Sequence, residues 1–233
     1  TNSMRGAAFL SGLTEAIVVD IGGTTADLGS LKKGFPRQAS MVVKVGGVRT
    51  NFRMPDVFSM GLGGGSRVVG SGKDIRIGPA SVGYRITEEA LIFGGSTLTA
   101  SDIAVAAGKA DFGDRSKVAH LAPDLVEAAQ RKILEMLDDA IDHARISPEP
   151  VPVIVVGGGS ILVGDAIGDV PVVKPDHFAV ANAVGAAIAQ ISGEVERVYS
   201  LSDISREEAL EDARKKAQDA AVAAGASAKS IEI

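Results

Sequence analysis

The sequence contains no cysteine, no tryptophan and only three histidines among its 233 residues. The lack of cysteine excludes disulfide bridges, thiolate zinc sites and catalysis by a cysteine nucleophile. The histidines, His120, His143 and His177, lie far apart and show none of the spacings at which histidines bind a metal ion. Aromatic residues make up only 4% of the chain, so the core must be built from valine, isoleucine, leucine and alanine.

Positive charge and long hydrophobic runs are also lacking. The net charge is −5 at pH 7 and no basic stripe is available to neutralise phosphates, so we expect no nucleic-acid partner. No apolar run approaches the roughly 20 residues of a membrane-spanning helix, and no signal-peptide pattern opens the chain. We therefore expect no membrane partner and a cytoplasmic location. With 45% hydrophobic and 23% charged residues, the composition is typical of a globular protein.

The pattern of apolar residues predicts strands that alternate with helices. We expect strands at residues 15–21, 26–31, 41–45, 151–156 and 170–173, with a turn at Gly46-Gly47. We expect helices at residues 100–108, 123–144 and 177–191. The glycine-rich stretch 53–98 is interpreted as an irregular insertion that carries loops. This order predicts an α/β fold of ribonuclease-H-like type, with a mixed sheet flanked by helices.

The composition becomes charged after Gly193. Ser205 and Glu208 have the spacing of a capping box, which predicts a helix that runs to Gly225. We therefore expect one domain at residues 1–193, with the insertion at about 53–98, and a charged helical extension at 194–233. The first residue is not methionine and the last four resemble the start of a strand, so we expect the chain to be a fragment of a longer protein.

The first motif with a chemical interpretation is D-x-G-G-T-x-x-D. Its turn consists of Gly22, Gly23, Thr24 and Thr25, flanked by Asp20 and Asp27. Glycines in a tight turn let successive backbone N–H groups point into one concavity that suits phosphate oxygens, and the threonine hydroxyls would add donors. Because carboxylates repel phosphate, the aspartates make sense if Mg²⁺ lies between them and the phosphates. An ordinary hairpin with a positive φ at the glycines is the alternative, but the complete spacing favours phosphate binding.

The second motif follows a strand that is apolar on both faces. It consists of Gly157, Gly158, Gly159 and Ser160. Three glycines leave the backbone bare, so a flat ring can lie against it. A dinucleotide-binding turn is a rival interpretation because Asp176 lies at about the expected acidic spacing, but Leu162 takes the place of the third glycine.

Two further clusters are ambiguous by themselves. Residues 60–66 (MGLGGGS) could form a flexible surface loop or a loop near an active cleft. Residues 181–187 (ANAVGAA) contain small side chains typical of close helix packing, and Asn182 is the polar exception.

In order, these motifs resemble the actin-like ATPase superfamily, which includes sugar kinases, heat-shock chaperones and actin. There, DIGGTTAD corresponds to a phosphate loop and VVGGGS to an adenosine loop. Within the superfamily the chain is most similar to the hydantoinase A/5-oxoprolinase family, through TNSMRGAAFLSG, DIGGTTADLG, GLGGGSRVV, IGPASVGY, FGGSTLTASDIAVAAG and ANAVGAA. Members carry two halves with one D-x-G-G-T loop each. The resemblance therefore implies that this chain is the C-terminal half, and that a missing N-terminal half of the same polypeptide completes the cleft.

The resemblance also implies an activity, the ATP- and magnesium-dependent hydrolysis of a small cyclic amide. The γ-phosphoryl group of ATP would pass to the amide oxygen and make the ring carbon susceptible to water. Asp20 and Asp27 would be catalytic and organise Mg²⁺, the turn 22–25 would hold the phosphates, and residues 157–160 would pack against the nucleoside. A second hydantoinase-type subunit is a further candidate partner. Two alternatives remain, a subunit of an ATP-dependent ketone carboxylase and a non-enzymatic nucleotide-driven switch. The isolated segment is expected to be inactive.

Overall fold

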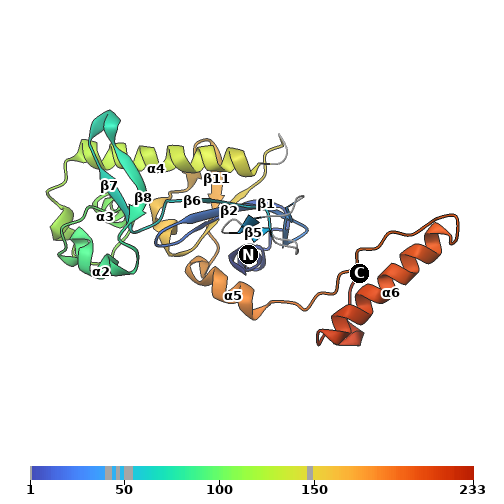
Figure 1. Cartoon of the computed structure of the whole chain (residues 1–233). Coiled ribbons are helices and arrows are strands. Elements are labelled where there is room, and N and C mark those ends of the chain that lie inside the picture. Colours follow the sequence, from blue (N-terminus) through green and yellow to red (C-terminus); the bar gives the residue numbers. More distant parts are fainter. Residues whose placement is uncertain (1, 40–43, 46–47, 50–54, 146–148) are drawn as a thin grey trace. The chain divides into compact units, whose positions relative to one another are not determined.

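The computed structural model describes residues 2–39, 44–45, 48–49, 55–145 and 149–233. The chain folds as two compact units, Thr1–Ile188 and Ala189–Ile233 (Figure 1). Part of the predicted strand at 41–45 (residues 41–43), the predicted turn at Gly46-Gly47 and the first residues of the predicted insertion (53–54) lie outside the described residues.

The first unit is built on a mixed sheet. Its strands are β1 Ala16–Ile21, β2 Ala26–Lys32, β3 Phe35–Pro36, β6 Val57–Met60, β9 Val153–Val156, β10 Ala166–Ile167 and β11 Val170–Val173. The strand order is β10-β11-β9-β1-β2-β3, and β6 also pairs with β2. β1 runs antiparallel to β2 and parallel to β9. The predicted hairpin and the two later strands are therefore confirmed.

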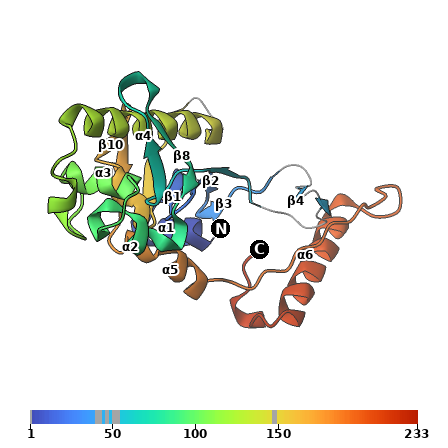
Figure 2. The ribbon, with the colours of Figure 1, turned by 60° about the vertical axis from the view of Figure 1, so that its left-hand side comes forward.

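Helices cover both faces of this sheet. They are α1 Asn2–Ser11, α3 Ala100–Ala106, α4 Pro123–Ala144 and α5 Ala181–Ala187. Ile86 of the short helix α2 Ile86–Glu89 packs against a separate small cluster. Side chains alternate between the faces of a strand, so Val19 of β1 packs in the core cluster with α3 and α4, whereas Val18 packs in the cluster with α1 and α5. Figures 1 and 2 show α4 on one side of the sheet and α1 and α5 on the other. The mixed sheet flanked by helices is as predicted.

The long helix α4 follows the expected amphipathic pattern. Ile133, Leu137 and Ile141 recur at intervals of four residues and are buried against the sheet. Pro123 occupies the first turn, where its missing N–H costs no helical hydrogen bond.

Smaller elements connect these layers. Two short antiparallel strand pairs consist of β4 Lys44–Val45 with β5 Val48–Arg49, and β7 Ser66–Val69 with β8 Arg76–Ser81. The 3₁₀ helices are η1 Gly72–Asp74, η2 Gly83–Arg85, η3 Leu91–Phe93, η4 Arg115–Val118, η5 Gly158–Leu162, η6 Phe178–Val180 and η7 Ala228–Ser230.

Three expectations about local structure need correction. The segment predicted as irregular contains β6, a strand of the main sheet. The helix expected at 177–191 is only Ala181–Ala187. His177 has a left-handed φ of 63°, so no helix begins at that residue, and Phe178–Val180 form a 3₁₀ helix. The last residues do not begin a strand: Ala228–Ser230 is a 3₁₀ helix, and residues 231–233 have no regular secondary structure.

The second unit contains α6 Arg206–Ala223 and an extended segment that packs on it. The predicted capping box is confirmed: the Ser205 N–H donates to Glu208 Oε2 at 2.8 Å, and the Glu208 N–H donates to Ser205 Oγ at 3.2 Å. A Cβ added at Gly193 would lie 2.1 Å from the Ala217 carbonyl oxygen, so glycine allows the extended segment to contact the helix. In the described part of the chain, no helix combines the length and the apolar character needed to cross a bilayer.

Candidate functional site

The two glycine motifs meet at one edge of the sheet. β1 and β9 are parallel with Asp20 opposite Val156, so both strands end at this edge. A Cβ added at Gly157 would lie 2.4 Å from Asp20 Oδ1, and one added at Gly159 would lie 2.8 Å from the Gly22 carbonyl oxygen. The structure therefore brings the turn 22–25 and the segment 157–160 into direct contact.

The turn is closed by one hydrogen bond and open to solvent. The Gly22 N–H donates to the Thr25 carbonyl at 2.8 Å, and Gly23, Thr24 and Thr25 are exposed. Neither Gly22 nor Gly23 is among the glycines with positive φ. A Cβ added at Gly23 would meet no atom within 4 Å. Neither the backbone conformation nor crowding by neighbouring atoms therefore requires a glycine at position 23.

The segment 157–160 combines one strained glycine with one open glycine. Gly157 has a φ of 87° and its N–H donates to the Phe178 carbonyl at 2.9 Å. Gly158 is exposed, lacks a positive φ and has open space where a Cβ would be. Ser160 is fully buried and its hydroxyl donates to the Gly157 carbonyl at 2.6 Å. The bare backbone surface of this segment is thus centred on Gly158.

The two aspartates form a polar row with a serine. Asp20 lies opposite Asp27 across β1 and β2, and Asp27 lies opposite Ser59 across β2 and β6. Residues directly opposite each other project from the same face of a sheet. The Ser59 hydroxyl donates to a carboxylate oxygen of Asp27. Sequence reasoning missed Ser59 because it did not place β6 in the main sheet.

The acidic groups of the site are few. Among the described residues, no group of three or more histidine, aspartate or glutamate side chains could hold a metal ion. Asp20 and Asp27 are half-buried carboxylates on one face, the kind of oxygen ligand that Mg²⁺ accepts. Because Mg²⁺ commonly keeps several waters and takes one or two carboxylates plus substrate phosphates, this pair fits such an ion only together with a bound phosphate.

The glycine-rich segment Gly63–Ser66 lies against the turn. Its residues are buried, so the interpretation as a flexible surface loop is wrong. The Gly64 N–H donates to the Gly22 carbonyl at 3.0 Å, and the Gly65 N–H donates to the Gly23 carbonyl at 2.7 Å. This segment and residues 157–160 therefore both contact the turn or the strand end that precedes it.

Two lysines add positive charge beyond β9. Lys174 follows β11 at the same edge of the sheet, and its Nζ donates to the Val163 carbonyl at 2.5 Å. Burial lowers the pKa of Lys174, while Asp165 opposes this shift and Lys109 adds to it. Burial likewise lowers the pKa of Lys109. The exposed Asn182 lies on α5 and makes none of the contacts that define the edge.

Known proteins share this architecture. Residues 3–114 match the sequence model of the family described as Hydantoinase/oxoprolinase. No curated protein sequence matches the chain. The nucleotide-free structure of acetone carboxylase, from work on ATP-dependent acetone carboxylation, is 20% identical to this chain and has a TM-score of 0.62. The match covers 98% of this chain and 38% of the acetone carboxylase chain. The ATP-dependent caprolactamase from Pseudomonas jessenii is 21% identical and has a TM-score of 0.63. That match covers 94% of this chain and 37% of the caprolactamase chain.

These likenesses concern the fold. Because the two structures are only 20% and 21% identical to the chain, they show the fold alone, and they confirm the predicted α/β ribonuclease-H-like fold. The chain spans a little over a third of the length of either structure.

Proposed function

Because residues 3–114 belong to the hydantoinase/oxoprolinase family, we propose that this chain is the C-terminal, nucleotide-binding half of an ATP-dependent enzyme that opens a small cyclic amide. An N-terminal half of the same polypeptide would close the cleft over the turn 22–25. The short span of the chain relative to its structural neighbours supports this division.

The main support for a nucleotide site comes from two exposed glycines. Gly23 and Gly158 are exposed, and a Cβ at either position would meet no atom of the chain. Neither residue has the positive φ that favours glycine. Since they belong to two segments in contact with each other, a ligand that approaches both backbones accounts for both glycines. ATP has the two parts required, a polyphosphate for the turn and a nucleoside for the bare segment.

Each motif then has a separate task. The N–H groups of the turn and the hydroxyls of Thr24 and Thr25 hold the β- and γ-phosphates. Residues 157–160, including Gly159 and Ser160, support the nucleoside. Asp20 and Asp27 hold Mg²⁺, which neutralises charge on the phosphates when it is bound.

The reaction follows from what an amide lacks. A ring amide carbon is a poor electrophile, so water does not attack it readily. Transfer of the γ-phosphoryl group to the amide oxygen releases ADP and makes the ring carbon susceptible to water. Water adds to this carbon, the ring C–N bond breaks as the nitrogen takes up a proton, and hydrolysis of the resulting acyl phosphate releases inorganic phosphate. The chain's contribution is to orient the phosphates and stabilise the charge that develops on them.

A ketone carboxylase subunit is the second candidate function. The specific observation in its favour is that acetone carboxylase has the same fold over 98% of this chain. Phosphorylation of a carbonyl oxygen would serve carboxylation as well as hydrolysis, and the fold does not distinguish the two. A nucleotide-driven switch without a metabolite substrate is the third.

An ATP-turnover assay on the complete polypeptide tests these functions. Stimulation by 5-oxoproline or a hydantoin supports the amidase, stimulation by a ketone with bicarbonate supports the carboxylase, and turnover independent of any metabolite supports the switch. We expect the present chain alone to bind ATP weakly and not to hydrolyse it, because an open cleft does not exclude water. Robust hydrolysis by this chain would contradict the division into two halves.

The variant Asp20→Asn tests the carboxylates in the same assay. We expect turnover to fall by about a hundredfold or more, because the lost charge acts in the transition state. Asp169→Asn is the matched control, since Asp169 is exposed between β10 and β11 and outside the site. Normal turnover by Asp20→Asn would make Asp20 a structural residue.

A further inference from the structure

The segment Gly63–Ser66, here called the glycine brace, is in backbone contact with the turn. Its two hydrogen bonds run from the N–H groups of Gly64 and Gly65 to the carbonyls of Gly22 and Gly23. A Cβ added at Gly63 would lie 2.5 Å from the Thr24 nitrogen. The two backbones therefore approach as closely as glycine allows.

These bonds fix the direction in which the turn's donors point. In a planar trans peptide, the C=O and the N–H of one unit point in opposite directions. The carbonyls of Gly22 and Gly23 point at the brace, so the N–H groups of Gly23 and Thr24 point away from it. Both residues are exposed there. A rotated peptide unit would instead present a carbonyl oxygen, which repels phosphate.

The brace uses its own N–H groups within the protein. The Gly63 N–H donates to Ser66 Oγ at 2.9 Å, and the next two bond to the turn. The geometry points to a positioning role: the glycine brace orients the Gly23 and Thr24 N–H groups toward the phosphates of the nucleotide and does not bind the nucleotide itself. This inference rests on the proposed function.

Neighbouring elements hold the brace from behind. The Gly64 carbonyl accepts from the Ser101 N–H in the first turn of α3 at 2.9 Å. The side chain of the adjacent Asp102 is fully buried and accepts from the Ile92 N–H at 2.8 Å and from Thr99. This end of α3 is therefore fixed by a buried carboxylate, and the brace is fixed to α3.

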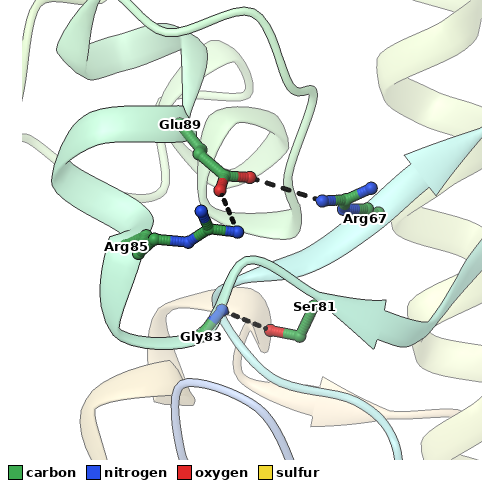
Figure 3. A network of polar contacts seen from close by, with 5 residues as sticks. All are labelled: Arg67, Ser81, Gly83, Arg85 and Glu89. Atoms are coloured by element: carbon green, nitrogen blue, oxygen red, sulfur yellow. Dashed lines mark hydrogen bonds and ion pairs between the residues drawn. The ribbon is translucent and has the colours of Figure 1, made fainter.

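The other side of the brace contacts the turn after β8. The Gly65 carbonyl accepts from the Val82 N–H at 2.9 Å. Figure 3 shows this turn, where the Gly83 N–H donates to Ser81 Oγ at 3.0 Å. Arg67, which follows Ser66 in β7, and Arg85 both form ion pairs with Glu89 of α2 (Figure 3). The pair from Arg67 links β7 to α2.

The main experiment compares two ligands in the complete polypeptide. Gly63→Ala places a methyl group against the turn and should weaken binding of the non-hydrolysable β,γ-imido analogue of ATP roughly 100-fold, the equivalent of two weakened bonds to a charged group. Adenosine, which lacks phosphates, should lose no more than about threefold. Gly164→Ala is the control, because position 164 has open space and no positive φ. Equal losses for both ligands, or none, would overturn the positioning role.

A gentler variant covers the case in which Gly63→Ala does not fold. A Cβ added at Gly64 would meet only Ser101 Oγ, at 2.9 Å. Gly64→Ala should therefore weaken the analogue less than Gly63→Ala does, and the double variant with Ser101→Ala should restore affinity by removing that oxygen. Failure of the double variant to recover would overturn the inference.

Hydrogen exchange separates this inference from the proposed function. Without nucleotide, the Gly64 and Gly65 amides should exchange slowly, because they donate to the turn, while those of Gly23 and Thr24 should exchange quickly. Fast exchange at Gly64 and Gly65 would overturn the brace whatever binds. Slow exchange there in a polypeptide that binds neither ligand would leave the brace intact and reject the nucleotide site.

Discussion

The sequence Gly-Gly-Gly-Ser occurs twice, at residues 63–66 and 157–160, and both copies contact the end of the first hairpin. In both copies the serine N–H donates to the carbonyl of the first glycine, at 3.0 Å and 3.1 Å. The copies differ in what lies around them. The first is buried throughout and lacks a positive φ, whereas the second begins with a φ of 87° and has one exposed glycine.

The difference shows that the same residues are glycine for different reasons. At Gly63 a neighbouring backbone excludes a side chain. At Gly157 both a neighbouring carboxylate and the backbone conformation exclude one. At Gly158 neither reason applies, and the proposed nucleotide would account for glycine at this exposed position. The neighbours, not the glycine content, decide the role of each position, and substitutions at single positions can separate these roles.

The largest effect is expected for Gly157→Ala. A residue with a side chain at a φ of 87° is strained by about 1–3 kcal/mol. The added Cβ would also lie 2.4 Å from both Asp20 Oδ1 and the Ile21 carbonyl oxygen, and such overpacking costs about 1–3 kcal/mol. We expect the free energy of unfolding, measured in urea titrations, to fall by about 2–6 kcal/mol, the sum of the two costs. A loss no larger than that of Gly158→Ala would refute the distinction between the two positions.

The sequence predicts most of this edge of the sheet but not the contacts around it. The hairpin of β1 and β2 and the apolar strand β9 follow from local patterns, and parallel pairing then brings Gly22 and Gly157 together. The bonds from the brace to the turn join residues about forty positions apart, and no local pattern encodes them. The hydrogen bond from Ser59 to Asp27 could not be predicted for the same reason, because it depends on the pairing of β6 with β2.

Substitutions of the two serines, Ser66 and Ser160, should reduce stability by intermediate and different amounts. Both serines are fully buried. Ser66→Ala removes the acceptor of the Gly63 N–H and leaves that buried donor without its bond, at a cost of about 1–3 kcal/mol. Ser160→Ala removes a donor to the Gly157 carbonyl, which still accepts from the Ser160 N–H, so the cost should be about 0.5–1.5 kcal/mol. Paired denaturation curves measure the difference. The reverse order would mean that the hydroxyls do not act through these bonds.

The smallest effect on stability is expected for Gly158→Ala. Position 158 has open space and no positive φ, so alanine fits there without strain. Alanine also restricts the unfolded chain, which stabilises a protein by about 0.4–1 kcal/mol at compatible positions. The free energy of unfolding should therefore stay the same or rise slightly, as for the control Gly164→Ala.

Binding should respond in the opposite way. A methyl group at position 158 would stand on the bare backbone that the proposed nucleoside contacts, so adenosine affinity in the complete polypeptide should fall about tenfold, the equivalent of a misfit of roughly 1.4 kcal/mol. Gly164→Ala should bind adenosine normally. A variant that is as stable as the parent but binds less well would show that glycine at 158 serves a ligand and not the fold. Unchanged adenosine affinity in Gly158→Ala would mean that Gly158 does not contact the nucleoside.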